Sequence, residues 1–174
     1  MKTSMWFVSL FALAAHAQEG TVPAPRTEEN KQLVQRLYET INGGRLEAID
    51  PLIDDAFAGA QGGRGPSAFA APIRALKQAF PDLHYTVEDL LAEGDRVAVR
   101  WKWTGTHQGP FGPYPPSHRK VTNDGMAIFR IKDGKIAASS IQTDRLGFLQ
   151  EIGVVSKDVG ARPPPAAPRS SVGQ

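Results

Sequence analysis

The strongest constraint on the fold is a short turn signal near residue 133. Asp133-Gly134 stands between two extended, apolar-rich runs, and an Asp-Gly pair in that setting is the strongest short-range signal for a tight β-hairpin. The two predicted arms and their flanks span residues 119–144. The chain must therefore form an antiparallel strand pair there, and its other segments must supply the layer that covers one face.

Side chains alternate between the two faces of a strand. On the first arm Met126, Ile128 and Arg130 share one face. On the second arm one face begins with an apolar residue, continues with small residues and ends with polar and ionisable ones, in the order Ile136, Ala138, Ser140, Gln142 and Asp144. We expect these faces to look inward, as the wall and the polar end of a ligand cavity.

The N-terminal half of the chain has a helical period. Apolar residues recur at helical spacing between residues 33 and 41, and Asn42-Gly43-Gly44 ends that helix. A shorter helix, interrupted at Pro51, is predicted across residues 46–53, and a third helix runs to Phe80. After residue 82 the period changes to two, which predicts strands at residues 84–92 and 96–106.

Three helices followed by four antiparallel strands predict an α+β fold. In the second strand Val97, Val99, Trp101 and Trp103 alternate with polar or small residues, which is typical of a sheet with one buried face. Residues 108–117 contain several prolines, which lack the N–H that a central strand needs. We predict that this segment is a loop at the rim of the cavity, and that residues 27–160 form one domain.

The two ends of the chain differ from this domain. Residues 1–17 combine Lys2, an apolar run and the small-x-small sequence Ala15-His16-Ala17, which predicts a secretory signal peptide and an exported, periplasmic or secreted protein. No further run of that kind follows, so we expect no membrane attachment after cleavage. Residues 18–26 form a polar lead, and residues 161–174 form a Pro-rich tail that we predict to be disordered.

Composition excludes several kinds of function. The chain has no cysteine, so neither thiolate catalysis nor a thiolate metal site is possible. It also has no His-x-His or His-Glu-x-x-His spacing, and we expect no metal site. Residues 18–160 hold 17 Lys and Arg against 18 Asp and Glu. This balance and the lack of a long basic run argue against a nucleic-acid partner.

Three stretches of the sequence resemble those of a known family. They are GPSAFAAPIRALKQAFPDLHYTVEDLLAEGDRVAVRWKWTGTHQG, IFRIKDGKI, and Asp144 with LGFLQEIG. Their order and intervals are similar to those of the SnoaL-like polyketide cyclases, or ester cyclases, of the nuclear-transport-factor-two-like superfamily, over roughly residues 28–153. The resemblance implies a cone-shaped, barrel-like fold in which three N-terminal helices pack on a curved antiparallel sheet and enclose a cavity.

The resemblance also implies a cofactor-free reaction. In such cyclases an aspartate near the end of the last strand acts as general acid and base in an intramolecular aldol condensation. Asp144 occupies that position here, and Arg130 is the basic side chain expected to hold the enolate or the carboxylate. The further residues expected to contact a small apolar carbonyl substrate are Gln142, His107, Trp103, Tyr38, Met126 and Ser140.

The ionisable candidates also have structural interpretations. Asp144 can cap a helix predicted at residues 146–152. Arg130 can be a solvated strand residue or a salt-bridge partner of Asp144 or Asp124, and His107 can make a structural hydrogen bond at a strand end. Other reactions of the superfamily fit less well, since the central strands have no Arg-x-Asp step for epoxide hydrolysis and no acid–tyrosine pair for ketosteroid isomerisation.

Two functions are compatible with this sequence. The first is an exported cyclase, and the alternative is a non-catalytic periplasmic protein of the same fold that binds a small molecule. The alternative is favoured by small residues at positions where many relatives carry His, Glu and Trp; here they are Ala58-Gly59-Ala60, Ala138 and Ser140. In both cases the partner is a small hydrophobic molecule, and we expect a homodimer through the outer face of the sheet.

Overall fold

The computed structural model describes residues 24–159. The predicted signal peptide at residues 1–17 and the predicted tail at residues 161–174 lie outside the described residues, so export and the disorder of the tail stay predictions. Within the described part of the chain, no helix combines the length and the apolar composition needed to cross a membrane.

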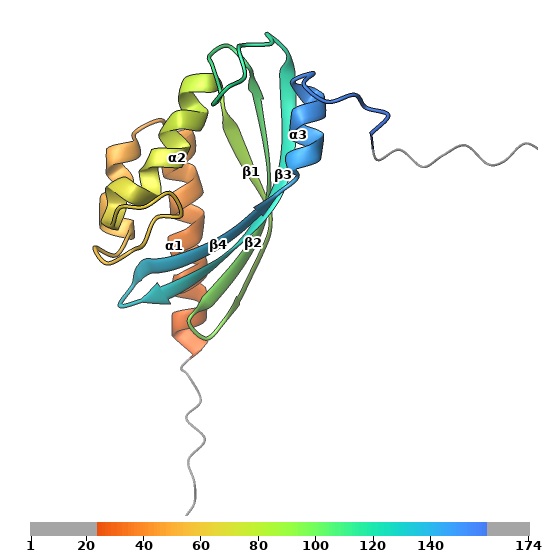
Figure 1. Ribbon diagram of the computed structural model, residues 1–174. Coiled ribbons are helices and arrows are strands. Elements are labelled where there is room, and N and C mark those ends of the chain that lie inside the picture. Colours follow the sequence, from red (N-terminus) through yellow and green to blue (C-terminus); the bar gives the residue numbers. More distant parts are fainter. Residues whose placement is uncertain (1–23, 160–174) are drawn as a thin grey trace, which may run out of the picture.

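Three helical segments come first along the chain, as predicted (Figure 1). Helix α1 (Ala24–Asn42) begins within the predicted lead and buries an apolar stripe. The predicted short second helix is a 3-10 helix, η1 (Leu46–Leu52), and it contains Pro51. Helix α2 (Gly65–Ala79) has a proline in its first turn, where the missing N–H would have had no partner in the helix.

Four strands form one antiparallel sheet in the order β1-β2-β3-β4. They are β1 (His84–Glu93), β2 (Arg96–Thr106), β3 (Lys120–Lys132) and β4 (Lys135–Thr143). The β3–β4 turn has φ of 50° at Asp133 and 73° at Gly134, and positive φ at both central residues is the geometry of a tight two-residue hairpin. A short helix, α3 (Arg145–Glu151), follows β4 directly. The predicted hairpin and the four predicted antiparallel strands are confirmed.

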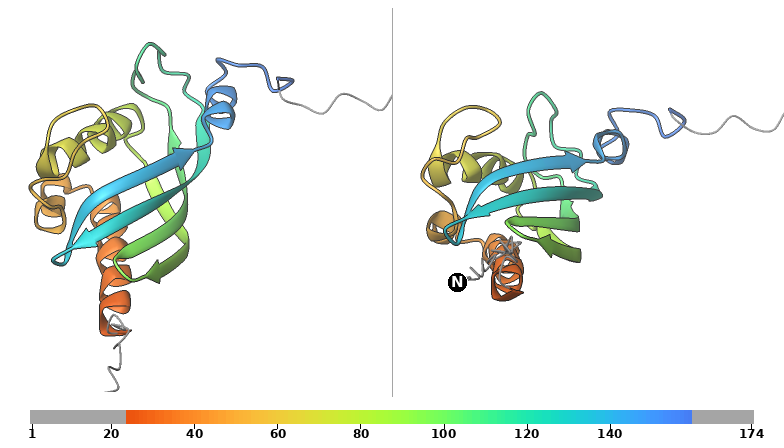
Figure 2. Two further views of the ribbon diagram at one scale, coloured as in Figure 1. Left: turned by 60° about the horizontal axis from the view of Figure 1, so that its bottom comes forward. Right: turned by 90° about the horizontal axis from the view of Figure 1, so that it is seen from below.

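The helices lie on one face of the strongly twisted sheet (Figures 1 and 2). Two hydrogen bonds of 2.8 Å tie α1 to β1, because the Asn42 amide donates to the carbonyl of Tyr85 and accepts from its N–H. At the end of α2 the carbonyl of Ala79 accepts from the N–H groups of Gln108 and Gly109, at 2.9 and 3.0 Å. The helices and the sheet are thus joined at two separate points and enclose a space between them.

The core lies between the helices and the inner face of the sheet. Phe80, which is fully buried, packs on the rings of Trp103 and His107, with ring centroids 5.0 and 4.9 Å apart. The buried apolar residues come from the helices, the strands and the connections between them: Leu33, Val34, Leu37, Tyr38, Ile41, Leu46, Ile49, Ile53, Phe57, Phe69, Ala70, Ala79, Phe80, Leu83, Val97, Val99, Trp101, Trp103, Val121, Ala127, Phe129, Ile131, Ile136, Phe148 and Ile152.

Strand β3 turns its odd-numbered residues toward the helices. Val121 and Phe129 are buried, whereas Met126 and Ile128 are 52% and 49% exposed. The prediction that Met126, Ile128 and Arg130 look inward is therefore wrong. The reason is that the charged residues of the strand all have even numbers and would be costly to bury; they are Lys120, Asp124, Arg130 and Lys132.

A β-bulge in β4 changes which residues of that strand face inward. Ile131 pairs with Ile136, but Arg130 pairs with Ala138, so Ala137 is one extra residue on β4. Ile136 is buried, as predicted. Beyond the bulge every side chain is shifted to the opposite face. The even-numbered residues predicted to form the cavity wall lie on the outer face instead.

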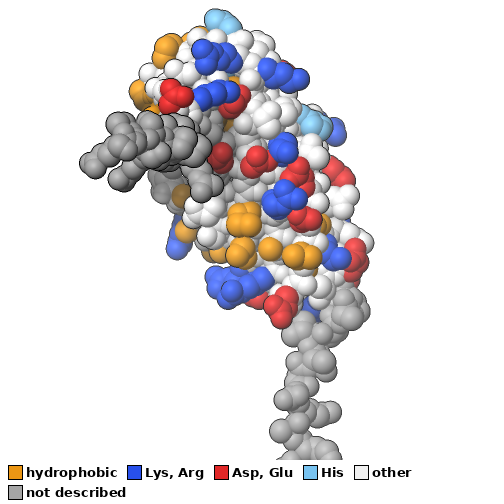
Figure 3. Space-filling model, turned by 90° about the vertical axis from the view of Figure 1, so that its right-hand side faces the viewer, with side chains coloured by type: hydrophobic (Ala, Val, Ile, Leu, Met, Phe, Trp, Pro, Cys, Tyr) orange, Lys and Arg blue, Asp and Glu red, His pale blue; other side chains and the backbone are white. Residues whose placement is uncertain are grey.

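The outer face of the sheet combines charged and apolar side chains (Figure 3). Arg100 pairs with Glu88 and with Asp89, and Lys102 pairs with Glu88 at 3.3 Å and with Asp124 at 3.6 Å. Apolar side chains on the same face are largely exposed; they are Leu91, Met126 and Ile128. The homodimer expected through this face stays a prediction.

Candidate functional site

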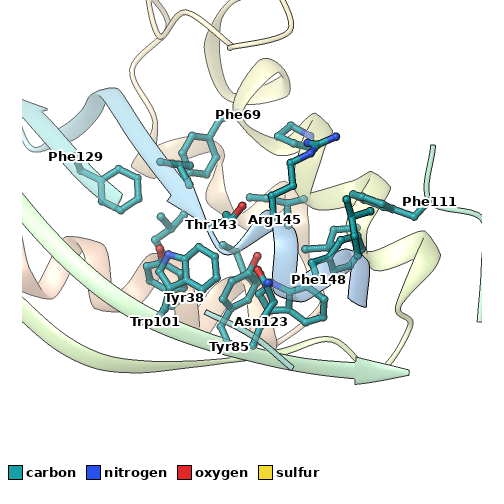
Figure 4. A pocket seen from close by; sticks show the side chains of 18 of the residues that line it. Tyr38, Phe69, Tyr85, Trp101, Phe111, Asn123, Phe129, Thr143, Arg145 and Phe148 are labelled. Atoms are coloured by element: carbon teal, nitrogen blue, oxygen red, sulfur yellow. The ribbon is translucent and has the colours of Figure 1, made fainter. Parts of the chain in front are cut away.

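A cavity of about 240 Å³ lies between the helices and the sheet, next to α3 (Figure 4). Two loop residues, Phe111 and Tyr114, line it, which confirms the predicted rim position of the segment 108–117. The other lining residues come from α1, α2, the four strands and α3: Leu37, Tyr38, Ile41, Phe69, Pro72, Ile73, Leu76, Tyr85, Trp101, Trp103, Asn123, Phe129, Ile141, Thr143, Arg145, Phe148 and Leu149.

Aromatic rings make up much of the cavity wall. The ring of Tyr85 meets that of Trp101 at 80°, with centroids 5.3 Å apart. Phe148 of α3 meets Phe111 of the loop at 71° and 5.2 Å. Edge-to-face contacts of this kind hold rings in defined orientations. The wall is thus preformed, and it suits a largely apolar ligand.

Gly125 makes room for one of these rings. It lies opposite Trp101 in the pairing of β2 with β3, and a β-carbon at residue 125 would overlap the Trp101 ring. Glycine therefore allows the indole to lie against the backbone of β3. Any larger residue would push the ring into the cavity.

Two tyrosine side chains line the cavity from opposite layers. Tyr38 lies on α1 and Tyr85 on β1, with ring centroids 5.5 Å apart. Burial raises the pKa of Tyr38, with a smaller contribution from Tyr85, and burial also raises the pKa of Tyr85. Both phenols therefore stay protonated and can donate a hydrogen bond. Among residues 24–159 neither hydroxyl has a hydrogen-bond partner, so both can serve a ligand.

Asn123 is a buried polar side chain in the wall, 5% exposed. Its Nδ2 donates to the carbonyl oxygen of Asp144 at 2.6 Å. Because a carbonyl can only accept, this bond fixes the orientation of the amide. Its Oδ1, which has no partner within the described residues, can accept a hydrogen bond from a ligand. Thr143 and Arg145, on either side of Asp144, also line the cavity.

The Asp144 carboxylate is not part of this lining. Asp144 is exposed and caps α3, with Oδ1 accepting from the N–H of Gly147 at 2.8 Å. Strand β4 ends at Thr143, so the strand alternation does not extend to residue 144. The prediction that Asp144 points into the cavity is wrong, and its interpretation as a helix cap is confirmed. Its catalytic role stays a prediction.

Four other predicted site residues lie on the outer face, because the even-numbered residues of β3, and of β4 beyond its bulge, point away from the helices. They are exposed and belong to β3 and β4: Arg130, Met126, Ser140 and Gln142. The expectation that they line the cavity is wrong. Trp103 and Tyr38 do line it.

His107 is fully buried beside the cavity but is not one of its lining residues. Its Nδ1 accepts a hydrogen bond from the N–H of Ser117 at 3.1 Å, and its ring stacks on Phe80. Burial lowers the pKa of His107, and repulsion from His118 lowers it further. The ring therefore stays neutral at pH 7, which fits its structural interpretation.

Sequence reasoning missed four polar residues of the cavity: Tyr85, Asn123, Thr143 and Arg145. Asn123 could have been predicted, since it is one of the odd-numbered residues of β3, none of which is charged. The other three carry no local signal, because their orientation depends on the bulge in β4, on the start of α3 and on the contact of β1 with α1.

Residues 31–152 match the family model described as SnoaL-like polyketide cyclase. The chain belongs to this family. Curated relatives are aklanonic acid methyl ester cyclases. DauD from Streptomyces sp. (strain C5) is 32% identical over 135 residues, which cover 76% of this chain and 77% of DauD. DnrD from Streptomyces peucetius is 29% identical over 128 residues, which cover 70% of this chain and 88% of DnrD.

Solved structures are similar to this chain in fold. TsrD from Streptomyces laurentii has a TM-score of 0.69 at 27% identity, covering 74% of this chain and 97% of TsrD. The SnoaL-like protein from Jannaschia sp. CCS1 has a TM-score of 0.67 at 28% identity, covering 76% of this chain and 97% of its own. These similarities confirm the predicted family and the cone-shaped α+β fold.

The cavity of this SnoaL-like protein can do three things chemically. It can bind an apolar ring system, donate hydrogen bonds from Tyr38 and Tyr85 to carbonyl oxygens, and balance negative charge with Arg145. No carboxylate lines it among the described residues. Nor does that part of the chain hold three His, Asp or Glu side chains close enough together to bind a metal ion.

Proposed function

We propose that this protein is a cyclase that closes a ring in an apolar, polyketide-like carbonyl compound without a cofactor. Membership of the SnoaL-like family supports the reaction class. The observation that carries the proposal is the aromatic cavity, whose free hydrogen-bond donors lie among apolar walls. Such an environment strengthens a hydrogen bond to a carbonyl oxygen as negative charge develops there.

The reaction needs a proton to leave a carbon that is flanked by carbonyl groups. The resulting enolate carbon then attacks a second carbonyl of the same molecule, a carbon–carbon bond forms, and the new alkoxide takes up the proton. Tyr38 and Tyr85 are placed to polarise the carbonyl groups, and a group at the rim must accept the proton.

We assign the proton transfer to Asp144. Its neighbours Thr143 and Arg145 line the cavity, and Asn123 holds its backbone carbonyl at 2.6 Å. The Asp144 backbone is therefore at the rim. Its carboxylate can turn toward a bound substrate only when it releases the N–H of Gly147, so substrate binding and the loss of this cap are coupled.

A second candidate is binding without chemistry. It is favoured by one observation, namely that the exposed Asp144 carboxylate serves as a helix cap and lies outside the cavity lining. On this view the protein holds a small apolar molecule and releases it unchanged.

Two variants of Asp144 separate catalysis from capping. Asn is as good a cap as Asp, whereas Ala is not. We expect both Asp144→Asn and Asp144→Ala to lower turnover at least ~100-fold. Only Asp144→Ala should lower the free energy of unfolding, by about 1 kcal/mol.

The measurements are single-turnover assays and chemical denaturation. The substrates are polyketide-type esters and acids, aklanonic acid methyl ester among them. Unchanged turnover in Asp144→Asn would remove Asp144 from the mechanism. Saturable binding of these compounds by the wild-type protein without any conversion would support the binding function instead.

A further inference from the structure

Arg145 is the one charged side chain among the described residues that line the cavity. It is the first residue of α3 and is exposed. In Figure 4 its side chain extends away from the rings of Trp101, Tyr85 and Phe148. The cavity therefore has an apolar, aromatic interior and a single cationic group at its open end.

No acidic side chain within residues 24–159 forms an ion pair with Arg145. Its neighbour Asp144 directs its carboxylate to the N–H of Gly147 instead. A guanidinium presents a planar set of N–H donors that matches a carboxylate in two parallel hydrogen bonds. The positive charge at the open end is thus available to an anionic group of a ligand.

The interior of the cavity indicates the chemistry of the part of the ligand that lies away from Arg145. The edge-to-face rings of Trp101 and Tyr85 make the interior aromatic, and the protonated hydroxyls of Tyr38 and Tyr85 can donate to acceptors such as a ketone oxygen. Asn123 Oδ1 can accept from a hydroxyl group. A cavity of about 240 Å³ is below the usual range of roughly 300–1,000 Å³ for ligand pockets, so it fits a small ring system better than a large one.

We propose that the preferred ligands are small aromatic or polyketo acids with a free carboxylate, and that Arg145 binds this carboxylate at the open end. This inference rests on the proposed function, because it names the substrate class for the same cavity. It also predicts a difference from DauD and DnrD, whose names specify a methyl ester. In this protein the acid should bind more tightly than its methyl ester.

The test compares 6-hydroxy-2-naphthoic acid with its methyl ester by isothermal titration calorimetry. The two probes have the same ring system and differ in the charge that Arg145 is proposed to bind. We expect the acid to bind about tenfold more tightly to the wild-type protein, as for a charge-assisted hydrogen bond in a partly exposed site. Added salt should weaken binding of the acid and leave binding of the ester unchanged.

Three variants assign the preference to one side chain. Arg145→Leu should bind the two probes equally, and Arg145→Lys should keep part of the preference. Arg74→Leu is the matched control, because Arg74 is exposed on α2 and does not line the cavity. It removes the same charge and should keep the full tenfold preference.

Each outcome decides the proposal. Equal affinity for acid and ester in the wild-type protein would overturn it, as would failure of both probes to bind. A preference that survives in Arg145→Leu, or that is lost in Arg74→Leu, would also overturn it. If the acid preference holds but no substrate is converted, the substrate class stands for a binding protein and only the cyclase function fails.

Discussion

The two faces of the sheet are built from the same strands but have opposite chemistry. On the inner face Trp101, Trp103 and Phe129 are at most 4% exposed and surround the cavity. On the outer face Arg100 and Lys102 form ion pairs in water, and Ile128 is half exposed. Since neighbouring residues of a strand point in opposite directions, a shift of one residue exchanges these environments. Register, and not composition, therefore decides which side chains can meet a ligand.

The largest expected difference in the free energy of unfolding is between substitutions of two adjacent residues of β3. Phe129→Ala should lower the free energy of unfolding by about 3 kcal/mol or more, because it removes a large buried ring. Ile128→Ala should change it by no more than about 0.5 kcal/mol, because that side chain is half exposed on the outer face. Denaturation with urea measures both. Similar losses in the two variants would mean that the outer face is covered in solution.

A smaller effect is expected at Gly125, where the inner face has no spare room. Gly125→Ala places a methyl group against the Trp101 ring, and overpacking of this kind costs about 1–3 kcal/mol. The displaced ring should also weaken binding of the naphthoic acid probe. Met126→Ala, one residue further on the outer face, is the control and should change neither quantity. A fully stable Gly125→Ala protein with normal binding would contradict the close contact between Gly125 and the Trp101 ring.

The smallest effect is a pH dependence that comes from His107, on the inner side of the sheet. Its pKa is lowered from 6.5 in the folded protein, so below about pH 6.5 the unfolded chain binds more protons than the folded one. Stability should therefore fall as the pH drops from 7 toward the lowered pKa. His107→Asn should reduce this slope, whereas His84→Asn, at an exposed position, should not. Equal slopes in all three proteins would exclude His107 as the source.

Much of the fold could be predicted because its signals are local. The helical spacing before residue 42, the alternation of β2 and the Asp133-Gly134 turn each depend on neighbouring residues, and the structure confirms all three. The orientation of β3 could also have been predicted, since all charged residues of this strand have even numbers and therefore lie on one face. We instead oriented both strands by the polar residues at the end of β4, but the bulge in β4 moves these residues to the outer face.

The sequence by itself determined the types and order of the elements, the antiparallel hairpin and the family, because periodicity, turn chemistry and ordered motifs are written along the chain. Only the tertiary structure decided which residues surround the cavity. The extra residue Ala137 can be recognised only when β4 is paired with β3. Asp144 turns to α3 and Arg145 to the cavity because the chain leaves the sheet between Thr143 and Arg145. These orientations arise from contacts between distant segments, which no local pattern specifies.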